Sequence, residues 1–226
     1  MELRIISIGT LSFHPNWGEG SPVRTGHATT SLIRSGDRVV LVDPGLPQQM
    51  IGARLQERAG VRPDAVTDVF LTRFHPEVWR GIGAFANARW LIGGRERESV
   101  GVPLASHLKR AMEEGDDETV EALRQHIAIL HRCEAAPDRL APGLDLFPLY
   151  GVSPGLCGLL IDEARHTTLI CGDAVATIEH LLDGKVLRGA ADISQAKESF
   201  AEAIEIADIL VLGRDNMVVN PTKRPF

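Results

Sequence analysis

Short apolar runs rich in β-branched residues alternate with turn signals along most of the chain. In the first half, such runs predict a strand over residues 3–9, a hairpin over 28–45, and strands over 66–72 and 88–93. Ser35, Gly36 and Asp37 form the turn of the hairpin, and Pro44 and Gly45 end its second strand. In the second half, similar runs predict strands over residues 144–151, 158–163, 166–173 and 207–213.

Helical periodicity appears between these strands. A helix is predicted over residues 48–60, and two more between residues 103 and 133. The second of this pair begins near Asp116 and Asp117, where carboxylates favour the positive end of the helix dipole, and it aligns Val120, Leu123, Ile127 and Leu130. A last helix is predicted over residues 193–207, with its buried side formed by Ile193, Ala196, Phe200 and Ile204.

The order of these elements predicts the architecture. Two β-rich halves, each finished by helices, favour two sheets packed face to face with helices outside. Because no low-complexity linker separates the halves, we expect a single α/β domain over residues 1–226.

Composition narrows the function classes. The chain is 44% hydrophobic and 24% charged, as in ordinary globular proteins, and its net charge of −6 without a basic run argues against nucleic acids and anionic membranes as partners. No apolar run approaches the ~20 residues of a membrane span. The start of the chain reads as a strand rather than a leader, and Cys133, Cys157 and Cys171 are widely spaced. These features predict a cytoplasmic protein with reduced, buried thiols.

Five segments at strand ends carry a family resemblance. They are VLVDPG at Asp43, FLTRFHPEVWRG at residues 70–81, LYGVSPGLCGLLI at residues 149–161, LICGDAV at Asp173 and LVLGRDN at Arg214. In this order, they resemble the landmarks of the metallo-β-lactamase fold superfamily over nearly the whole chain. The resemblance implies a four-layer αββα sandwich with an active site at one edge, where the loops converge, and it implies that Asp43 orders nearby loops.

The resemblance also implies where metal ligands would lie. The family's ligand positions match Arg73, His75, Glu77, Val78, Val152, Asp173 and Arg214. Only His75 and Asp173 keep the family's ligand type, and Glu77 is a carboxylate substitute. A catalytic zinc uses about three protein ligands, and guanidinium groups cannot ligate because they stay protonated. We therefore expect no metal cofactor.

Charge suggests what replaces the metals. Without dications, Asp173 and Glu77 would be buried carboxylates lacking partners, which is costly. Arg73 and Arg214 supply positive charge in the same place, and a guanidinium group pairs with a carboxylate in a bidentate manner. We predict that one arginine pairs with Asp173 while Glu77 takes the other.

Three functions remain open from the sequence. The first is a non-hydrolytic binding or scaffold protein, whose pocket of Arg73, His75, Glu77, Asp173, Arg214 and His180 could hold a small anionic ligand. The second is a hydrolase of esters, thioesters, lactones or phosphoesters with one rebuilt Zn, Mn or Fe site, using His75, Asp173 and Glu77.

In that second case His180 or His27 could replace a lost ligand. The third is a metal-free acid–base enzyme. Asp173, Arg73 and Arg214 are the catalytic candidates for any activity. An early loop with His14 and Trp17 could also cover the cleft.

Overall fold

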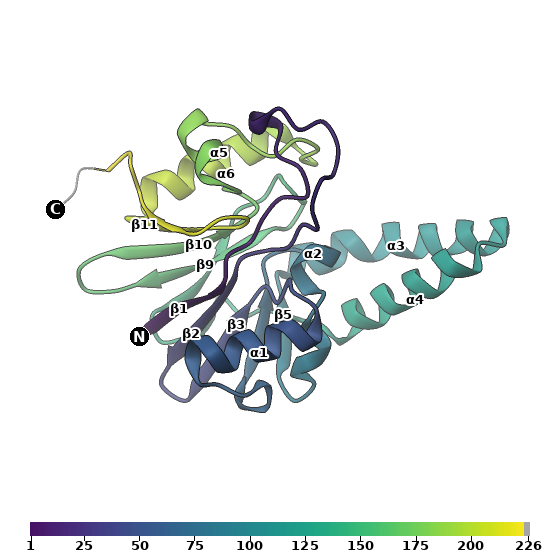
Figure 1. Ribbon diagram of the computed structural model, residues 1–226, viewed down its shortest axis with the longest axis horizontal. Helices are drawn as coiled ribbons and strands as arrows, with labels where there is room; N and C mark the ends of the chain where they lie inside the picture. The colour runs from purple at the N-terminus through teal and green to yellow at the C-terminus, as the bar shows by residue number, and fades with distance from the viewer. Residues whose placement is uncertain (224–226) are drawn as a thin grey trace.

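The computed structural model describes residues 1–223 and has two six-stranded sheets (Figure 1). The first sheet has the order β1-β2-β3-β4-β5-β6 and the second the order β12-β11-β10-β9-β8-β7. The strands of the first sheet are β1 Glu2–Ser7, β2 Thr30–Ser35, β3 Arg38–Val42, β4 Asp68–Leu71, β5 Arg89–Ile92 and β6 Glu134–Ala135. Those of the second are β7 Arg139–Ala141, β8 Leu144–Pro148, β9 Cys157–Asp162, β10 Thr167–Gly172, β11 Ile209–Leu212 and β12 Met217–Val219.

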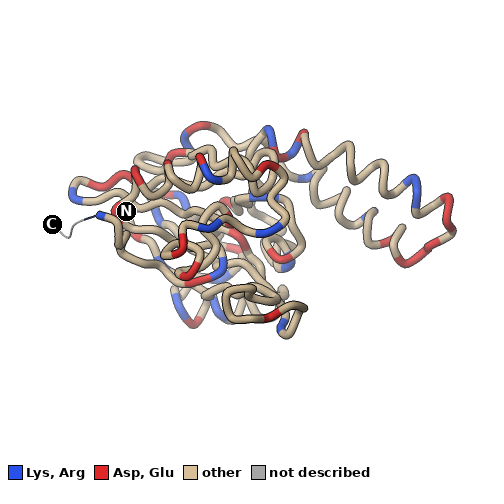
Figure 2. Tube along the Cα trace, turned by 90° about the horizontal axis from the view of Figure 1, so that it is seen from above, with Lys and Arg blue, Asp and Glu red and all other residues tan. Residues whose placement is uncertain are grey.

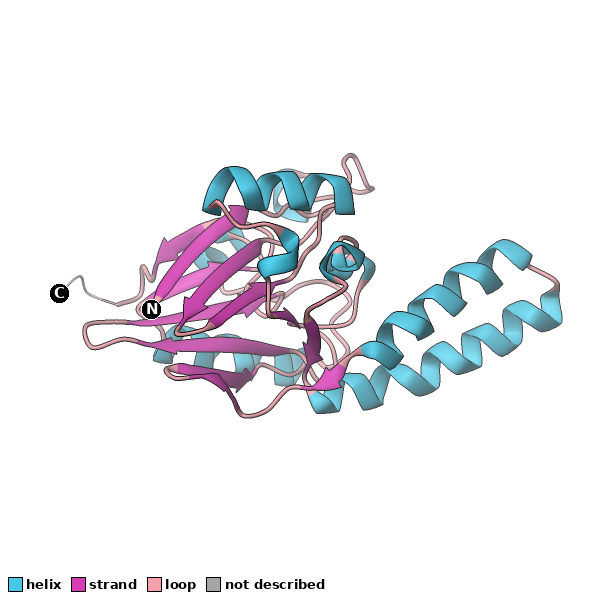
Figure 3. Cartoon of the chain, turned by 90° about the horizontal axis from the view of Figure 1, so that it is seen from below, coloured by secondary structure: helices cyan, strands magenta, loops and turns pink. Residues whose placement is uncertain are grey.

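Helices cover the outer faces of both sheets (Figure 3). The α-helices are α1 Gln48–Ala59, α2 Pro76–Trp79, α3 Gly94–Glu114, α4 Asp117–Arg132, α5 Ile178–Asp183 and α6 Ile193–Ile206. Short 3₁₀ segments are η1 Pro15–Trp17, η2 Pro63–Ala65 and η3 Ile82–Phe85. None of the helices in residues 1–223 is both long and apolar enough to cross a bilayer.

Three apolar clusters define the four layers. One lies between the sheets and includes Ile33, Val42, Phe70, Leu159 and Ile170. A second packs α1 and η3 against the first sheet, and a third packs α5 and α6 against the second sheet. Each strand that separates two clusters is buried on both faces, which explains its continuous apolar run. The predicted αββα sandwich is confirmed.

Parallel pairing places several strand ends at the same edge. β3, β4, β5 and β6 run parallel to one another in the first sheet, as do β10 and β11 in the second. The other neighbouring strands pair antiparallel. The carboxyl ends of β3, β4, β10 and β11 are therefore available to build a site where the two sheets meet.

Two sequence predictions about helices were wrong. The first helix of the middle pair begins at Gly94, not near Pro103, and continues through this exposed proline. Proline is common in the first turn of a helix, so Pro103 suggested a start. Here it lies in the helix interior, where it removes one backbone hydrogen bond and crowds the carbonyl of the preceding turn. On α6, Ile193 is 59% exposed, and Ser199 and Ala203 are buried with Ala196 and Phe200.

Other predictions agree with the structure. Asp116 caps α4 by accepting a hydrogen bond from the Thr119 backbone N–H at 3.1 Å. The three cysteines are free and buried. The short strands β6, β7 and β12 lacked a clear apolar run and were not predicted. The stretch NPTKRPF at residues 220–226 reads as a tail after the last predicted strand, and its last three residues lie outside the described residues.

Candidate functional site

Four strand ends supply the residues at the junction of the two sheets. Asp43 follows β3, Arg73 lies two residues after β4, Asp173 follows β10, and Arg214 lies two residues after β11. Backbone hydrogen bonds connect the two halves here: the Cys157 N–H donates to the Thr72 carbonyl at 3.0 Å, and the Thr29 N–H donates to the Gly213 carbonyl at 2.8 Å. The site is thus fixed by backbone contacts between the sheets.

Two glycines allow the strand ends to approach this closely. Gly172 has φ +51°, and a Cβ atom there would lie 2.7 Å from the Thr72 side chain. A Cβ atom at Gly213 would lie 2.3 Å from the Gly172 carbonyl oxygen. Only glycine fits these positions without moving the strand that carries the adjacent Asp173 or Arg214.

The predicted ionic residues form one connected group, which we call the arginine cluster: Arg73, His75, Glu77, Asp173 and Arg214. Arg214 donates from Nε to Asp173 Oδ1 at 2.7 Å and from Nη2 to Asp173 Oδ2 at 2.9 Å. Its remaining Nη1 donates to Glu77 Oε2. Arg73 Nη2 lies 2.7 Å from Asp173 Oδ2. One guanidinium group therefore bridges both carboxylates, while the second reinforces Asp173.

This arrangement corrects the expected division of partners. We predicted one arginine for each carboxylate, but both arginines contact Asp173 and Glu77 pairs with Arg214. The reason is geometric, because the three nitrogens of a guanidinium fork point in two directions and can serve two acids at once.

Burial makes these ion pairs electrostatically strong. The side chains of Arg214 and Asp173 are 1% and 2% exposed. Burial alone would raise the pKa of the Asp173 carboxyl, but Arg214 and Arg73 outweigh it and hold that pKa far below its usual range. Burial likewise opposes the charge on Arg214, yet Asp173 and Glu77 raise its pKa further above the ordinary value. Both groups stay charged at any physiological pH.

His75 and Asp43 lie near the Arg214–Asp173 ion pair, and their pKa values are shifted in opposite directions. Burial, and then the charges of Arg73 and Arg214, lower the pKa of His75 to about 4, so its ring is neutral near pH 7. His75 Nδ1 accepts a hydrogen bond from the Glu77 backbone N–H at 3.3 Å. Asp43 accepts from the Thr72 backbone N–H and hydroxyl, each at 2.8 Å, and burial raises its pKa to about 7. Asp43 thus orders the loop before Arg73, as the resemblance implied.

The donor set does not fit a pair of metal ions. Both oxygens of Asp173 and one oxygen of Glu77 are held by guanidinium groups. The His75 Nδ1 is engaged with the backbone. A like-charged dication at ~4 Å from either guanidinium would be repelled by about 8 kcal/mol at an effective dielectric of 20. Among residues 1–223, no group of three or more histidine, cysteine or acidic side chains is arranged to hold a metal ion.

Sequence reasoning missed Glu96, which supports the loop of the arginine cluster. This carboxylate is 1% exposed in the first turn of α3. Its Oε1 accepts from the Phe74 N–H at 2.9 Å, and its Oε2 accepts from the Gly155 N–H at 3.0 Å and the Ser153 hydroxyl at 2.8 Å. A glutamate in the first turn of a helix gives no signal of such a role, because that position is common for solvated acids.

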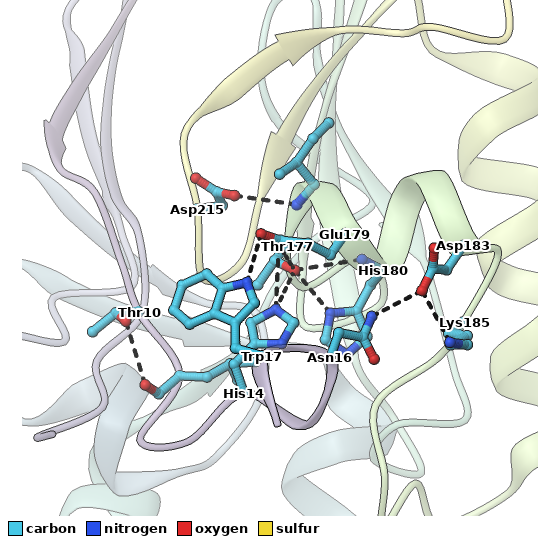
Figure 4. A network of polar contacts seen from close by, with 12 residues as sticks. Thr10, His14, Asn16, Trp17, Thr177, Glu179, His180, Asp183, Lys185 and Asp215 are labelled. Carbon is cyan, nitrogen blue, oxygen red and sulfur yellow. Dashed lines mark hydrogen bonds and ion pairs between the residues drawn. The ribbon is translucent and has the colours of Figure 1, made fainter. Parts of the chain in front are cut away.

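A second polar network begins four residues after Asp173 along the chain and includes residues of the N-terminal loop. We call it the histidine cluster: His14, Trp17, Thr177, Glu179 and His180 (Figure 4). The Thr177 hydroxyl is 2.9 Å from His14 Nε2, 2.9 Å from His180 Nδ1 and 2.7 Å from Glu179 Oε2. Trp17 Nε1 donates to Glu179 Oε1 at 2.9 Å and stacks on His14 with ring centroids 4.5 Å apart.

This network fastens the N-terminal loop to α5. His14 is 1% exposed, and its Nδ1 has no hydrogen-bond partner within residues 1–223. Its Nε2 lies 3.2 Å from Glu179 Oε2 in addition to its contact with the Thr177 hydroxyl. Burial, and then His14, lower the pKa of His180. The histidine cluster is held by hydrogen bonds around one hydroxyl, with Glu179 as its acid.

The structure separates the remaining predicted histidines from the arginine cluster. Within the described chain, no hydrogen bond or ion pair joins His180 to the arginine cluster; it bonds Thr177 instead. His27 Nε2 lies 3.1 Å from the Ile8 carbonyl oxygen, and both residues line a surface pocket that contains no residue of the arginine cluster. His14 and Trp17 pack against α5.

The layers, the strand order and the strand-end site define a class of αββα sandwich proteins, and comparisons with known proteins give the family. The family model of the metallo-beta-lactamase superfamily matches residues 23–209, so the chain belongs to this superfamily. No curated protein matches the sequence.

Solved structures with this fold are similar at low sequence identity. A putative metallo-beta-lactamase from Thermotoga maritima has 19% identity and a TM-score of 0.69, and the match covers 96% of this chain and 98% of that one. AidC, a dizinc quorum-quenching lactonase solved with a product, has 17% identity and a TM-score of 0.69, with coverage of 88% and 76%. A B. thuringiensis protein with N-decanoyl-L-homoserine at its active site has 20% identity and a TM-score of 0.66, with coverage of 94% and 92%. At these identities the likeness establishes the fold.

Proposed function

We propose that this protein is a non-hydrolytic member of its superfamily, in which arginine side chains replace metal ions as counter-ions of the site. The observation that carries the proposal is the bridging of Asp173 and Glu77 by Arg214. A dication added next to these carboxylates would lie beside the fixed positive charge of the guanidinium group, and that repulsion opposes metal binding. The site keeps its shape because the ion pairs do what metal–ligand bonds would otherwise do.

The ligand that we propose is a small carboxylate or phosphate bound at Arg73. Arg73 is the more exposed arginine of the cluster, with 16% of its side chain accessible. It uses Nη2 on Asp173, and its buried Nε has no partner among the described residues. A buried donor without a partner calls for an explanation, and an anion oxygen would satisfy it. Arg73 would then act in binding, with Arg214 holding the site together.

Anion binding is tested by titrating the full-length protein with acetate, citrate and inorganic phosphate in a calorimeter. We expect saturable binding of at least one of them, weakened at least tenfold in Arg73→Gln. Arg80→Gln is the matched control, because Arg80 follows α2 and donates to the Gly26 carbonyl at 3.3 Å rather than to an acid of the arginine cluster. No saturable binding, or equal binding by Arg73→Gln, would contradict the anion site.

Hydrolysis is tested separately with ester, thioester, lactone and phosphoester reporters, after expression with added Zn, Mn or Fe. We expect turnover no greater than that of the Asp173→Asn variant. Turnover lost in Asp173→Asn and abolished by a chelator would favour the mononuclear metal hydrolase. Turnover lost in Asp173→Asn but resistant to the chelator would favour a metal-free acid–base enzyme. Either result would overturn the non-hydrolytic assignment.

A further inference from the structure

The α3–α4 hairpin is an arm that the rest of the domain leaves uncovered. It projects away from the sandwich as two antiparallel helices (Figures 1 and 3). Only Glu96 and Ala111 of α3 and Val120 and Leu130 of α4 are buried. At its root the arm is well anchored, since Glu96 bonds two loops. Two long helices with so few buried residues add little to the core of the sandwich, which points to another role for the arm.

One face of the arm carries apolar side chains at helical spacing. Val102 is 72% exposed and Met112 is 57% exposed, while Ala105 and Leu108 lie between them on the same stripe of α3. A groove of about 370 Å³ lies over this stripe and reaches α4. Its lining comprises Ala105, Leu108, Lys109, Met112, Glu113 and Ile127. The apolar stripe is therefore continuous across both helices of the hairpin.

Charge is unevenly distributed along the arm. The tip contains six acidic residues and no basic residue between positions 113 and 121: Glu113, Glu114, Asp116, Asp117, Glu118 and Glu121. At the exposed root of α3, Arg95 and Arg97 outnumber the single exposed acid, Glu98, because Glu96 is buried. Figure 2 shows the acidic positions gathered at the far end of the hairpin. Two such arms would repel tip to tip but attract tip to root.

We propose that the arm binds the same arm of a second copy of this chain, in an antiparallel two-fold arrangement that forms a four-helix interface. A two-fold axis places the acidic tip of each copy on the basic root of the other, and it brings the two apolar stripes together. A 21-residue helix is about 31 Å long, and two helices side by side are about 20 Å wide. Each copy thus offers on the order of 600 Å², which reaches the lower end of stable interfaces at about 1,200 Å² in total.

The mass of the full-length protein in solution tests the proposal. Light scattering and sedimentation are expected to approach twice the 24.6 kDa of the chain as the concentration rises to about 100 µM, with a dissociation constant in the micromolar range. Ala105→Glu combined with Met112→Glu is expected to give the monomer. Ile193→Glu is the matched control, since Ile193 is an equally exposed apolar residue on α6 and its change leaves the dimer intact.

A charge-exchange experiment tests the antiparallel arrangement. Glu113→Lys, in the lining of the groove, and Arg97→Glu each place like charges together in a homodimer, so each variant alone is expected to dimerise at least tenfold more weakly. Mixing the two restores opposite charges at both ends, so the mixed pair is expected to regain the affinity of the original dimer. Both positions are exposed, and circular dichroism checks that each variant is folded.

Three results would overturn the proposal. They are a monomer at every concentration, a dimer that Ala105→Glu with Met112→Glu leaves unchanged, and a mixture that dimerises no better than its components. None of them bears on the arginine cluster, so this inference and the proposed function can fail separately.

Discussion

The arginine and histidine clusters share the chain segment that follows β10 but are held together differently. Asp173 belongs to the first and Thr177 to the second, and Arg214 is followed by Asp215, which accepts from the Ile178 N–H at 3.1 Å. The arginine cluster joins buried opposite charges, whereas the histidine cluster shares hydrogen bonds around one hydroxyl. The first is therefore costly to break and insensitive to pH, and the second is cheaper to break and sensitive to pH.

The largest effect is expected from removing the bridging guanidinium group. Arg214→Met leaves Asp173 buried with only Arg73 and leaves Glu77 without its arginine, which should lower the free energy of unfolding by about 3–5 kcal/mol. Urea unfolding measures this. Arg62→Met, which breaks an exposed pair with Asp64, should leave the midpoint unchanged.

Adding Asp173→Asn to Arg214→Met should recover part of the loss, because the buried acid is then neutral. A loss below about 1 kcal/mol for the single variant would mean that the pair does not hold the site.

The second-largest effect is expected from removing the Thr177 hydroxyl at the centre of the histidine cluster. Thr177→Ala removes the N-cap of α5 and the partner shared by His14 and His180, so we expect a loss of about 1–2 kcal/mol in the free energy of unfolding. Thr177→Ser keeps the hydroxyl and should retain most of the stability. If the serine variant is as unstable as the alanine variant, packing rather than hydrogen bonding holds α5.

A smaller effect concerns pH. Because burial lowers the pKa of His180 below the unfolded value of about 6.5, the unfolded chain binds protons first as the pH falls. Its contribution to stability is complete above about pH 6.5 and is lost below it. Glu179, Asp183, Lys185 and His14 are the charged or titratable groups that act on this ring.

Asp43, with a pKa raised to about 7, has the opposite sign and stabilises the fold as the pH falls from about 7 to 4. Comparing His180→Gln with the unchanged chain isolates the contribution of His180 to the pH dependence of stability. The change in unfolding midpoint from pH 7 to pH 5, taken with its sign, should be more positive in the variant than in the unchanged chain, and an equal change would remove His180 from the account.

The smallest effect is expected at the rim of the histidine cluster. Trp17 is 55% exposed and donates one hydrogen bond to Glu179. Trp17→Phe removes that bond but keeps the ring over His14, so the free energy of unfolding should fall by about 0.5–1 kcal/mol. Limited proteolysis of the N-terminal loop should become faster in the variant. Unchanged cleavage would show that this bond does not fasten the loop.

The sequence predicted the fold well because apolar strands and turn residues act locally. The four layers followed from the alternation of strands and helices, and the arginine cluster followed from the resemblance, which matched its residues to the family's ligand positions. The shared use of Asp173 by both arginines could not be predicted, because it depends on the distance between two sheets that are far apart in sequence.

Glu96 and the histidine cluster were missed for a similar reason. Glu96 resembles any acidic residue in a first helical turn, and only the folded chain brings Phe74 and Gly155 to it. His14 and Thr177 are 163 residues apart, so no local pattern joins them.

The central claim is that Arg214 occupies the charge position that a dication would need. Zinc titration of the purified full-length protein at pH 7 by calorimetry tests it most directly. The account predicts no saturable site, whereas Arg214→His combined with Arg73→His should gain one, since imidazole nitrogen ligates zinc. Binding of about one zinc ion per unchanged chain, lost on Asp173→Asn, would contradict the account.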